Sequence, residues 1–351
     1  MEESCITNGV TVEIKEGIRR DDKSAIGNDF NITDEYCWGI LHHAAQFGSL
    51  NITKFLVNDQ GVSFNTKNKE RNKPIHIAAD EGKEEIVKFF LDKGVEIDTE
   101  GKDDYTPLHY AAEKGNENIV ELLVERGANI YAVNSDGKTP LQLAEDKHHY
   151  MTKNLMLNRA LLSSVKQGDR NKVAQHIGNG ANINHSDFQG WALLHHAANR
   201  TVDDENFIKF LVEKEANINA TTNDGDKPLH IASSRTHVNI VSFFIGDKGI
   251  AIDDQGKDKW TPLHHAVNKD SESFVEFLIK KGASIYVKDY NNTTPLQLAN
   301  DKRVKPKLLG KALIDAVNGN DITKAVDYIQ KGANVDYSYE DRKWTPLHYA
   351  S

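Results

Sequence analysis

The chain has 351 residues, of which 38% are hydrophobic and 27% are charged, as in an ordinary globular protein. These values exclude a disordered acidic tail, a collagen-like chain and a bundle of membrane helices. The net charge of -9 disfavours a nucleic-acid partner, because a protein that holds a phosphate backbone needs a surplus of lysine and arginine.

The N-terminus gives no sign of a targeting segment. It begins Met-Glu-Glu-Ser, and no long apolar run follows, so a secretory signal is not expected. No stretch approaches the roughly 20 apolar residues that a membrane-spanning helix needs. We therefore expect no membrane segment in this chain, and we favour the cytoplasm as its compartment.

A four-residue motif recurs along the chain. It reads Thr-Pro-Leu-His in its fullest form, and its fourth residue is called the anchor position here. The anchors fall at residues 42, 76, 109, 142, 195, 230, 264, 297 and 348. Most neighbouring anchors are 33 to 35 residues apart, which is the sequence signature of a repeat architecture.

Each repeat predicts two helices and a short hairpin. In the copy at residues 104–131, Thr106 can cap the first helix and Pro107 fits its first turn, where a missing amide hydrogen costs nothing. Ala111 and Ala112 give this helix a narrow apolar face, which lets the second helix approach closely. The second helix carries apolar residues at helical spacing, and Gly127 ends it before the hairpin.

The period of about 33 residues and the T-P-L-H-x-A motif resemble the ankyrin repeat. The resemblance implies an all-α fold, an ankyrin-repeat solenoid of helix-turn-helix repeats with short β-hairpin connections. It covers residues 34–351 as an array of about eleven repeats, and residues 1–33 form an N-terminal segment that we expect to act as a degenerate cap. One repeat cannot bury its apolar face alone, so neighbouring repeats must stack.

Two anchor intervals are longer, at 53 and 51 residues. Each holds a repeat whose hairpin and Thr-Pro start are missing, so we expect joints near residues 142–160 and 297–311, where a helix runs almost directly into the next repeat. Anchors 42, 195 and 348 are 153 residues apart, which indicates two copies of a five-repeat unit and the start of a third. The last repeat stops at Ser351 within its first helix, and we expect the chain to be a fragment of a longer array.

Histidine occupies most anchor positions. The resemblance implies that these residues are structural and form hydrogen bonds at the helix start and to the neighbouring hairpin. They are His42, His76, His109, His195, His230, His264 and His348. A zinc site is not expected, because adjacent histidines on a helix point about 100° apart and no HExxH or CxxC motif is present.

The sequence contains no catalytic constellation. Phosphate-binding glycine loops and a Gly-x-Ser-x-Gly elbow are both missing. We therefore expect a non-enzymatic chain with no catalytic residues, no cofactor and no metal.

The tryptophans all lie four residues before an anchor histidine, in the hairpin just before the helix start. Tyr105 occupies the same place in another repeat. The candidate protein-binding residues are accordingly Trp38, Tyr105, Trp191, Trp260 and Trp344. In ankyrin-like proteins this position belongs to the concave binding face, where rigid aromatic side chains are favoured as hot spots. The alternative, that each ring packs on the next hairpin or on the helix start beside it, stays open.

These observations favour a scaffold that binds a partner protein through the concave face of hairpins and inner helices. An alternative is a fragment of a toxin or host-directed effector whose array recognises a target protein. The array is similar to the long ankyrin arrays of latrotoxin-like spider proteins and to ankyrin proteins of intracellular bacteria. An enzyme with a site grafted on the solenoid is the third hypothesis, and no convergent titratable cluster in the sequence supports it.

Overall fold

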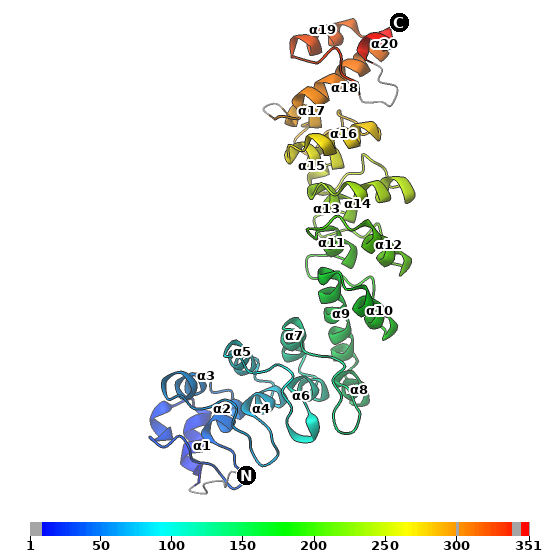
Figure 1. Cartoon of the computed structure of the whole chain (residues 1–351). Coiled ribbons are helices and arrows are strands. Elements are labelled where there is room, and N and C mark those ends of the chain that lie inside the picture. The colour runs from blue at the N-terminus through cyan, green and yellow to red at the C-terminus, as the bar shows by residue number, and fades with distance from the viewer. Residues whose placement is uncertain (1–8, 300–301, 339–344, 351) are drawn as a thin grey trace. The chain divides into compact units, whose positions relative to one another are not determined.

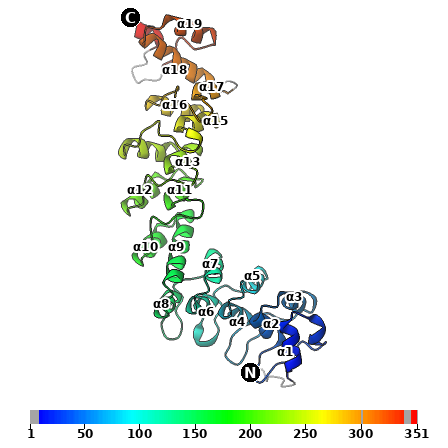
Figure 2. The same cartoon turned by 180° about the vertical axis from the view of Figure 1, so that it is seen from behind.

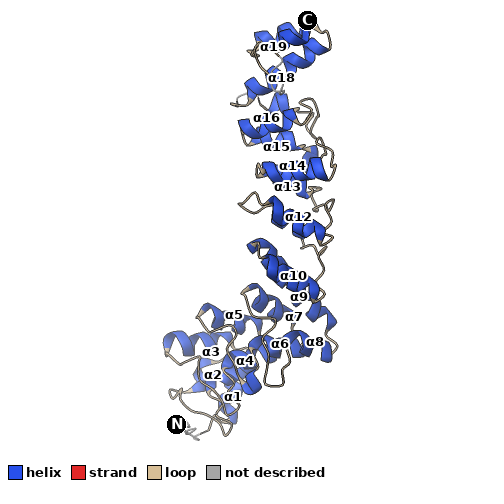
Figure 3. Ribbon diagram, turned by 45° about the vertical axis from the view of Figure 1, so that its right-hand side comes forward, coloured by secondary structure: helices blue, strands red, loops and turns tan. Residues whose placement is uncertain are grey.

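The computed structural model describes residues 9–299, 302–338 and 345–350. Within these ranges the regular structure is helical and no strand is formed, apart from two isolated β-bridges (Figure 3). The predicted all-α fold class is therefore confirmed. The chain divides into a first unit, residues 1–164 and 171–182, and a second unit, residues 165–170 and 183–351.

The first unit begins with the short helix α1, continues with three helix pairs and ends within the first long interval. Its elements are α1 (Val12–Arg19), η1 (Lys23–Ile26), α2 (Ile40–Phe47), α3 (Leu50–Lys54), η2 (Phe55–Asp59), α4 (Pro74–Asp80), α5 (Glu84–Asp92), η3 (Lys102–Asp104), α6 (Pro107–Lys114), α7 (Glu117–Glu125), α8 (Pro140–Asp146), most of α9 (Tyr150–Gln167) and most of α10 (Arg170–Gly178). The inner helices α2, α4, α6 and α8 pack one against the next, and the outer helices α3, α5 and α7 do the same (Figure 1).

The second unit repeats this arrangement. Its elements are α11 (Leu193–Ala198), α12 (Glu205–Glu213), α13 (Pro228–Ser234), α14 (Val238–Ser242), η4 (Phe243–Asp247), η5 (Lys257–Lys259), α15 (Pro262–Asn268), α16 (Glu272–Lys280), α17 (Pro295–Leu298), α18 (Lys305–Asn318), α19 (Ile322–Gln330) and α20 (Pro346–Ala350). Its inner helices α11, α13, α15 and α17 follow one another as direct neighbours (Figure 2).

The helix starts follow from the predicted capping residues. The Thr106 hydroxyl accepts a hydrogen bond from the amide of His109, and Pro107 stands in the first turn of α6. Because Ala111 and Ala112 are completely buried, the small side chains that the repeat places there allow the close approach of neighbouring helices. Gly115 ends α6 in the left-handed conformation that glycine adopts without steric cost.

The two long intervals contain long helices. Helix α9 runs for 18 residues in the first interval, and α18 runs for 14 residues in the second. In the first interval an outer helix and the next inner helix are thus one continuous helix. That these segments act as joints stays a prediction, as does the cap role of residues 1–33, in whose described part the α1 residue Ile18 is fully buried.

Candidate protein-binding face

The repeats are linked through short loops, called fingers here, which end at each Thr-Pro helix start. For the anchors from 42 to 297, the amide eight residues before the anchor donates to the carbonyl four residues later, as from Asp34 to Trp38 at 3.0 Å and from Asp187 to Trp191 at 3.1 Å. Within the described residues, the expected hairpins are therefore tight turns closed by backbone hydrogen bonds, without a strand ladder. A side chain at the same position supports the turn, since the Asp34 carboxylate accepts the amides of Tyr36 and Trp38.

Each anchor histidine joins its own helix start to the following finger. In His76 the Nδ1 atom accepts the Lys73 amide at 2.9 Å, and Nε2 lies 2.9 Å from the Thr99 carbonyl. The same two contacts, within its own repeat and to the next finger, are made by His42, His109, His195, His230 and His264. His348 accepts the Thr345 amide and is exposed.

These contacts define the protonation state of the anchors. The backbone amide can only donate and the carbonyl can only accept, so the ring must be neutral with its hydrogen on Nε2. A second proton on Nδ1 would point at the amide hydrogen. In agreement with this geometry, burial lowers the pKa of both His42 and His76 to about 4.

The aromatic side chains four residues before the anchors are half-buried in the four described repeats that carry them: Trp38, Tyr105, Trp191 and Trp260. Trp344 lies outside the described residues. Each described ring packs on the anchor and also on the ring of the residue after the anchor. The centroid distance to this second ring is 5.3 Å for Trp38 and His43, and 5.2 Å for Trp191 and His196. The packing partners thus lie at the helix start of the same repeat, beside the ring.

A carboxylate fixes the second ring in two of these repeats. His43 Nε2 lies 3.1 Å from the Asp34 carboxylate, and the equivalent distance from His196 to Asp187 is 3.0 Å. Although burial opposes it, hydrogen bonds from the Trp38 amide and from Lys15 hold the pKa of Asp34 below its usual value. The sequence analysis missed this arrangement, yet the pattern Asp-x-x-x-Trp-x-x-x-His-His, present at residues 34–43 and 187–196, was a usable signal.

Trp260 is supported differently. Its ring centroid lies 6.1 Å from that of His264 and 5.2 Å from that of His265. Gly256 stands where the fingers of Trp38 and Trp191 have an aspartate, and a Cβ atom there would clash with the Asp226 carboxylate and with the buried ring of His230, which favours glycine. The Asp226 carboxylate accepts the Lys257 amide at 2.8 Å and thereby ties two successive fingers together.

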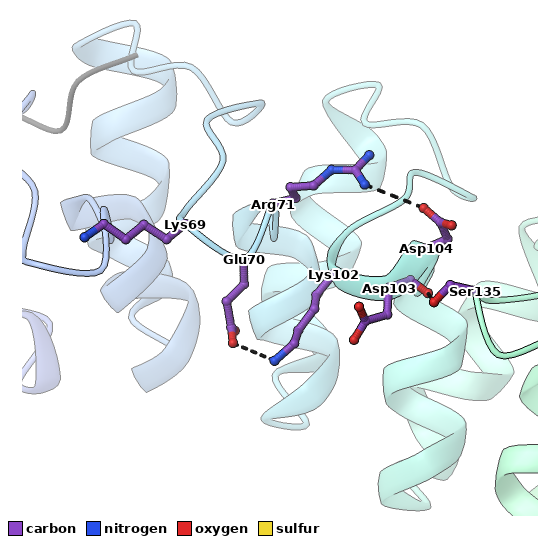
Figure 4. A pocket seen from close by; sticks show the side chains of 7 residues that line it. All are labelled: Lys69, Glu70, Arg71, Lys102, Asp103, Asp104 and Ser135. Carbon is purple, nitrogen blue, oxygen red and sulfur yellow. Dashed lines mark hydrogen bonds and ion pairs between the residues drawn. The ribbon is translucent and has the colours of Figure 1, made fainter. Parts of the chain in front are cut away.

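The finger tips of the first unit carry charges that are largely paired. Lys102 contacts Glu70 at 2.7 Å and Arg71 contacts Asp104 at 3.7 Å, both between successive fingers (Figure 4). The shallow depression between these tips contains both signs of charge. Such a surface does not select a ligand of one charge.

Other site types find no support in the part of the chain that the structure describes. No group of three histidine, cysteine or acidic side chains there could hold a metal ion. No helix among those residues is long and apolar enough to cross a membrane.

Comparison with known families identifies the repeat. Two family models described as ankyrin repeats match this chain, one at residues 23–101, 161–256 and 248–309 and the other at residues 91–144. Together they cover well over half of the sequence. The chain therefore belongs to the ankyrin-repeat family, whose repeats imply a scaffold for protein–protein interaction.

Individual relatives resemble parts of the chain. Alpha-latrocrustotoxin-Lt1a of Latrodectus tredecimguttatus is 33% identical over 27% of this chain and 7% of the toxin. Protein VAPYRIN-LIKE of Medicago truncatula is 28% identical over 50% of this chain and 38% of that protein. A putative ankyrin repeat protein of Rickettsia bellii is 33% identical over 30% of this chain and 26% of its own length. The chain thus matches well under half of each relative.

Proposed function

We propose that the chain is a non-enzymatic scaffold that binds a partner protein through its fingers and inner-helix ends. The observation that carries this proposal is the recurrent aromatic side chain before the anchor. Trp38, Tyr105, Trp191 and Trp260 are each held by two rings of their own repeat while part of their surface stays accessible. Trp344 occupies the same sequence position and is included in the proposal.

Preorganised aromatic side chains suit an interface for a physical reason. A side chain that is already fixed loses little rotational freedom on binding, so more of its contact energy appears as affinity. Tryptophan and tyrosine are also enriched among residues that dominate binding energy. The absence of a nucleic-acid partner and a cytoplasmic location are parts of the same proposal, and cell fractionation tests the second.

Replacing Trp260 by alanine tests the role of the aromatic position. A partner is first captured from a cell extract with the folded chain, identified by mass spectrometry and purified. We expect Trp260→Ala to weaken binding of that partner at least tenfold, about 1.4 kcal/mol, in isothermal titration. Trp260→Tyr, which introduces the residue present at position 105, should retain most of the affinity.

Phe277→Ala is the matched control. Phe277 is a half-buried aromatic residue on the outer helix of the same repeat and stacks on Phe274 with a centroid distance of 6.0 Å. Its loss should lower the melting temperature without changing affinity per folded molecule. If Trp260→Ala also lowers only the melting temperature, the aromatic position is structural and this form of the proposal fails.

A second candidate function is supported by the similarity to two spider toxins. Besides the latrocrustotoxin, Alpha-latroinsectotoxin-Lt1a of the same spider is 32% identical over 22% of this chain. On this proposal the array recognises a target protein for a toxin or host-directed effector. The identity of the captured partner decides between the two: a protein of a foreign host supports the effector, and a protein of the same cell supports the scaffold.

A further inference from the structure

The residue five positions after each anchor lies at or just beyond the C-terminal end of an inner helix. In the second unit this residue is a cation after the anchors at 195, 230, 264 and 297. We call these residues the cation row: Arg200, Arg235, Lys269 and Lys302. In the first unit the equivalent residues are Phe47, Glu81, Lys114 and Lys147, so only two are basic. The difference lies at the inner-helix ends that the proposed function already assigns to partner binding.

In the first unit, the two cations at this position are neutralised by the preceding repeat. Lys114 lies 3.5 Å from the Asp80 carboxylate, and Lys147 lies 3.2 Å from that of Glu113. Both acids occupy the position four residues after their anchor. Each inner-helix end thus supplies the counter-charge for the next one.

In the second unit, Arg235 and Lys302 contact neutral groups of the preceding repeat instead. Arg235 donates to the side-chain oxygen of Asn199 at 2.7 Å, and Lys302 donates to the backbone carbonyl of Asn268 at 3.2 Å. Lys269 is exposed and has no carboxylate within 4 Å in the described part of the chain. These contacts position the side chains, and no carboxylate of the described residues lies within 4 Å of the three cations.

The nearby carboxylates are already engaged. Asp203 accepts the amides of Asn239 and Ile240, at the start of α14. Asp204 is shared between Arg170 and Arg200, at 3.6 and 3.7 Å.

Asp270 is occupied in the same way. It pairs with Arg303 at 3.0 Å and accepts the Val304 amide. Three successive members of the cation row, Arg235, Lys269 and Lys302, therefore lack a carboxylate partner among the described residues.

We propose that this row binds an extended acidic segment of a partner protein. The inference rests on the proposed function and names the chemistry of the partner. Neighbouring helices pack about 8–10 Å apart, so successive cations are separated by about one such step. An extended or polyproline-type chain advances about 3.1–3.3 Å per residue, so every third residue of it matches one repeat. The preferred ligand has a glutamate or aspartate at every third position.

The test uses labelled synthetic peptides and the whole chain. One 13-residue peptide carries glutamate at every third position, a second carries the same glutamates as one consecutive run, and a third carries glutamine instead. Fluorescence anisotropy should show the first peptide binding at least fivefold more tightly than the second, and the third not binding. R235E/K269E should weaken the first peptide at least tenfold, and the neutral R235Q/K269Q should give an intermediate loss.

K214E/K281E is the matched control, because Lys214 and Lys281 are exposed residues at the ends of outer helices in the same unit. It changes the net charge equally and should alter peptide affinity less than twofold, with circular dichroism confirming that all variants fold. Equal losses in both double variants, equal affinity for the two glutamate peptides, or tighter binding of a single-stranded DNA oligomer would each overturn the acidic-segment inference. A captured partner whose binding is weakened by Trp260→Ala but unchanged by R235E/K269E would also overturn the inference, while leaving the proposed function intact.

Discussion

The two units are built from equivalent repeats, yet they treat the same positions differently. The first unit closes its inner-helix ends with ion pairs such as Lys114 to Asp80. The second places Ser234 and Asn268 where the first has Asp80 and Glu113, and Arg235, Lys269 and Lys302 have no carboxylate partner within 4 Å among the described residues. Packing and capping thus follow the repeat period, whereas the solvent-facing ends of the inner helices differ between the units, and we propose that partner specificity resides there.

A second difference concerns the contact between neighbouring fingers. In the first unit the Asn72 side-chain oxygen accepts both the Lys102 amide, at 3.0 Å, and the Tyr110 hydroxyl, at 2.8 Å. In the second unit Asp226 takes the place of Asn72, and His265 takes the place of Tyr110. The buried Nε2 atom of His265 has no hydrogen-bond partner there, so this junction is less well satisfied.

The largest expected effect comes from the anchors that both units share. The pKa of His76 is about 4 in the folded chain against an ordinary value of 6.5, a difference worth about 3 kcal/mol. Between these values the unfolded chain takes up a proton that the folded chain refuses, so stability is lost as the pH falls. His76→Gln should cost about 1 kcal/mol at pH 7 but flatten the decline in the free energy of unfolding from pH 7 to 4.5.

His230→Gln is the comparison from the second unit, since glutamine already occupies two anchors, at residues 142 and 297. His230 is as completely buried as His76, and its Nε2 atom lies 3.0 Å from the carbonyl of Asp254. Urea unfolding at pH 7 should therefore show a similar loss of about 1 kcal/mol for His230→Gln. A loss in only one of the two variants would show that the anchors do not contribute equally in the two units.

A smaller effect is expected from converting the first unit toward the second. D80N/E113Q removes the carboxylates that pair with Lys114 and Lys147 while preserving side-chain size. In a background carrying R235E/K269E, this change should restore part of the affinity for the peptide with spaced glutamates, about threefold to tenfold. Stability should change by less than about 1 kcal/mol, because exposed ion pairs contribute little. If anisotropy titrations show no gain in peptide affinity, cations without carboxylate partners are not sufficient for binding the acidic segment.

Much of the fold could be predicted because it depends on local, periodic signals. Thr106 and Pro107 act where the motif placed them, and Ala111 and Ala112 are buried as their size required. The long helix α9 follows from the missing hairpin in the first long interval. Each of these features is specified within one repeat, so its physics can be recognised without a neighbour.

The candidate site was less accessible to sequence reasoning, because its contacts join different positions and different repeats. The aromatic position was evident, but the ring on which Trp38 packs, His43, and the carboxylate of Asp34 that holds this ring required the finger geometry. The lack of carboxylate partners along the cation row likewise becomes visible only from the groups of the preceding repeat that Arg235 and Lys302 contact. A single side chain in the sequence does not report whether its charge is neutralised.

The smallest effect expected concerns the finger junction. His265→Tyr places a hydroxyl where Tyr110 has one in the first unit, beside Asp226, which already accepts a neighbouring amide as Asn72 does. The new hydroxyl can donate to this carboxylate, so we expect stabilisation of about 0.5 kcal/mol in thermal or urea unfolding. The exchange also removes a ring whose pKa burial lowers to about 3, so stability in acid should improve further.

The reciprocal change, Tyr110→His, makes this test decisive. It removes the hydroxyl that donates to Asn72 and leaves a buried ring in the first unit as in the second. If the hydroxyl at this junction accounts for the stabilisation by His265→Tyr, Tyr110→His should lower the free energy of unfolding by about as much as His265→Tyr raises it. The two variants exchange the same local arrangement between the units. A loss in both variants would instead mean that each ring is fitted to its own surroundings, and that the unpartnered nitrogen of His265 is compensated by packing against Trp260 and His230.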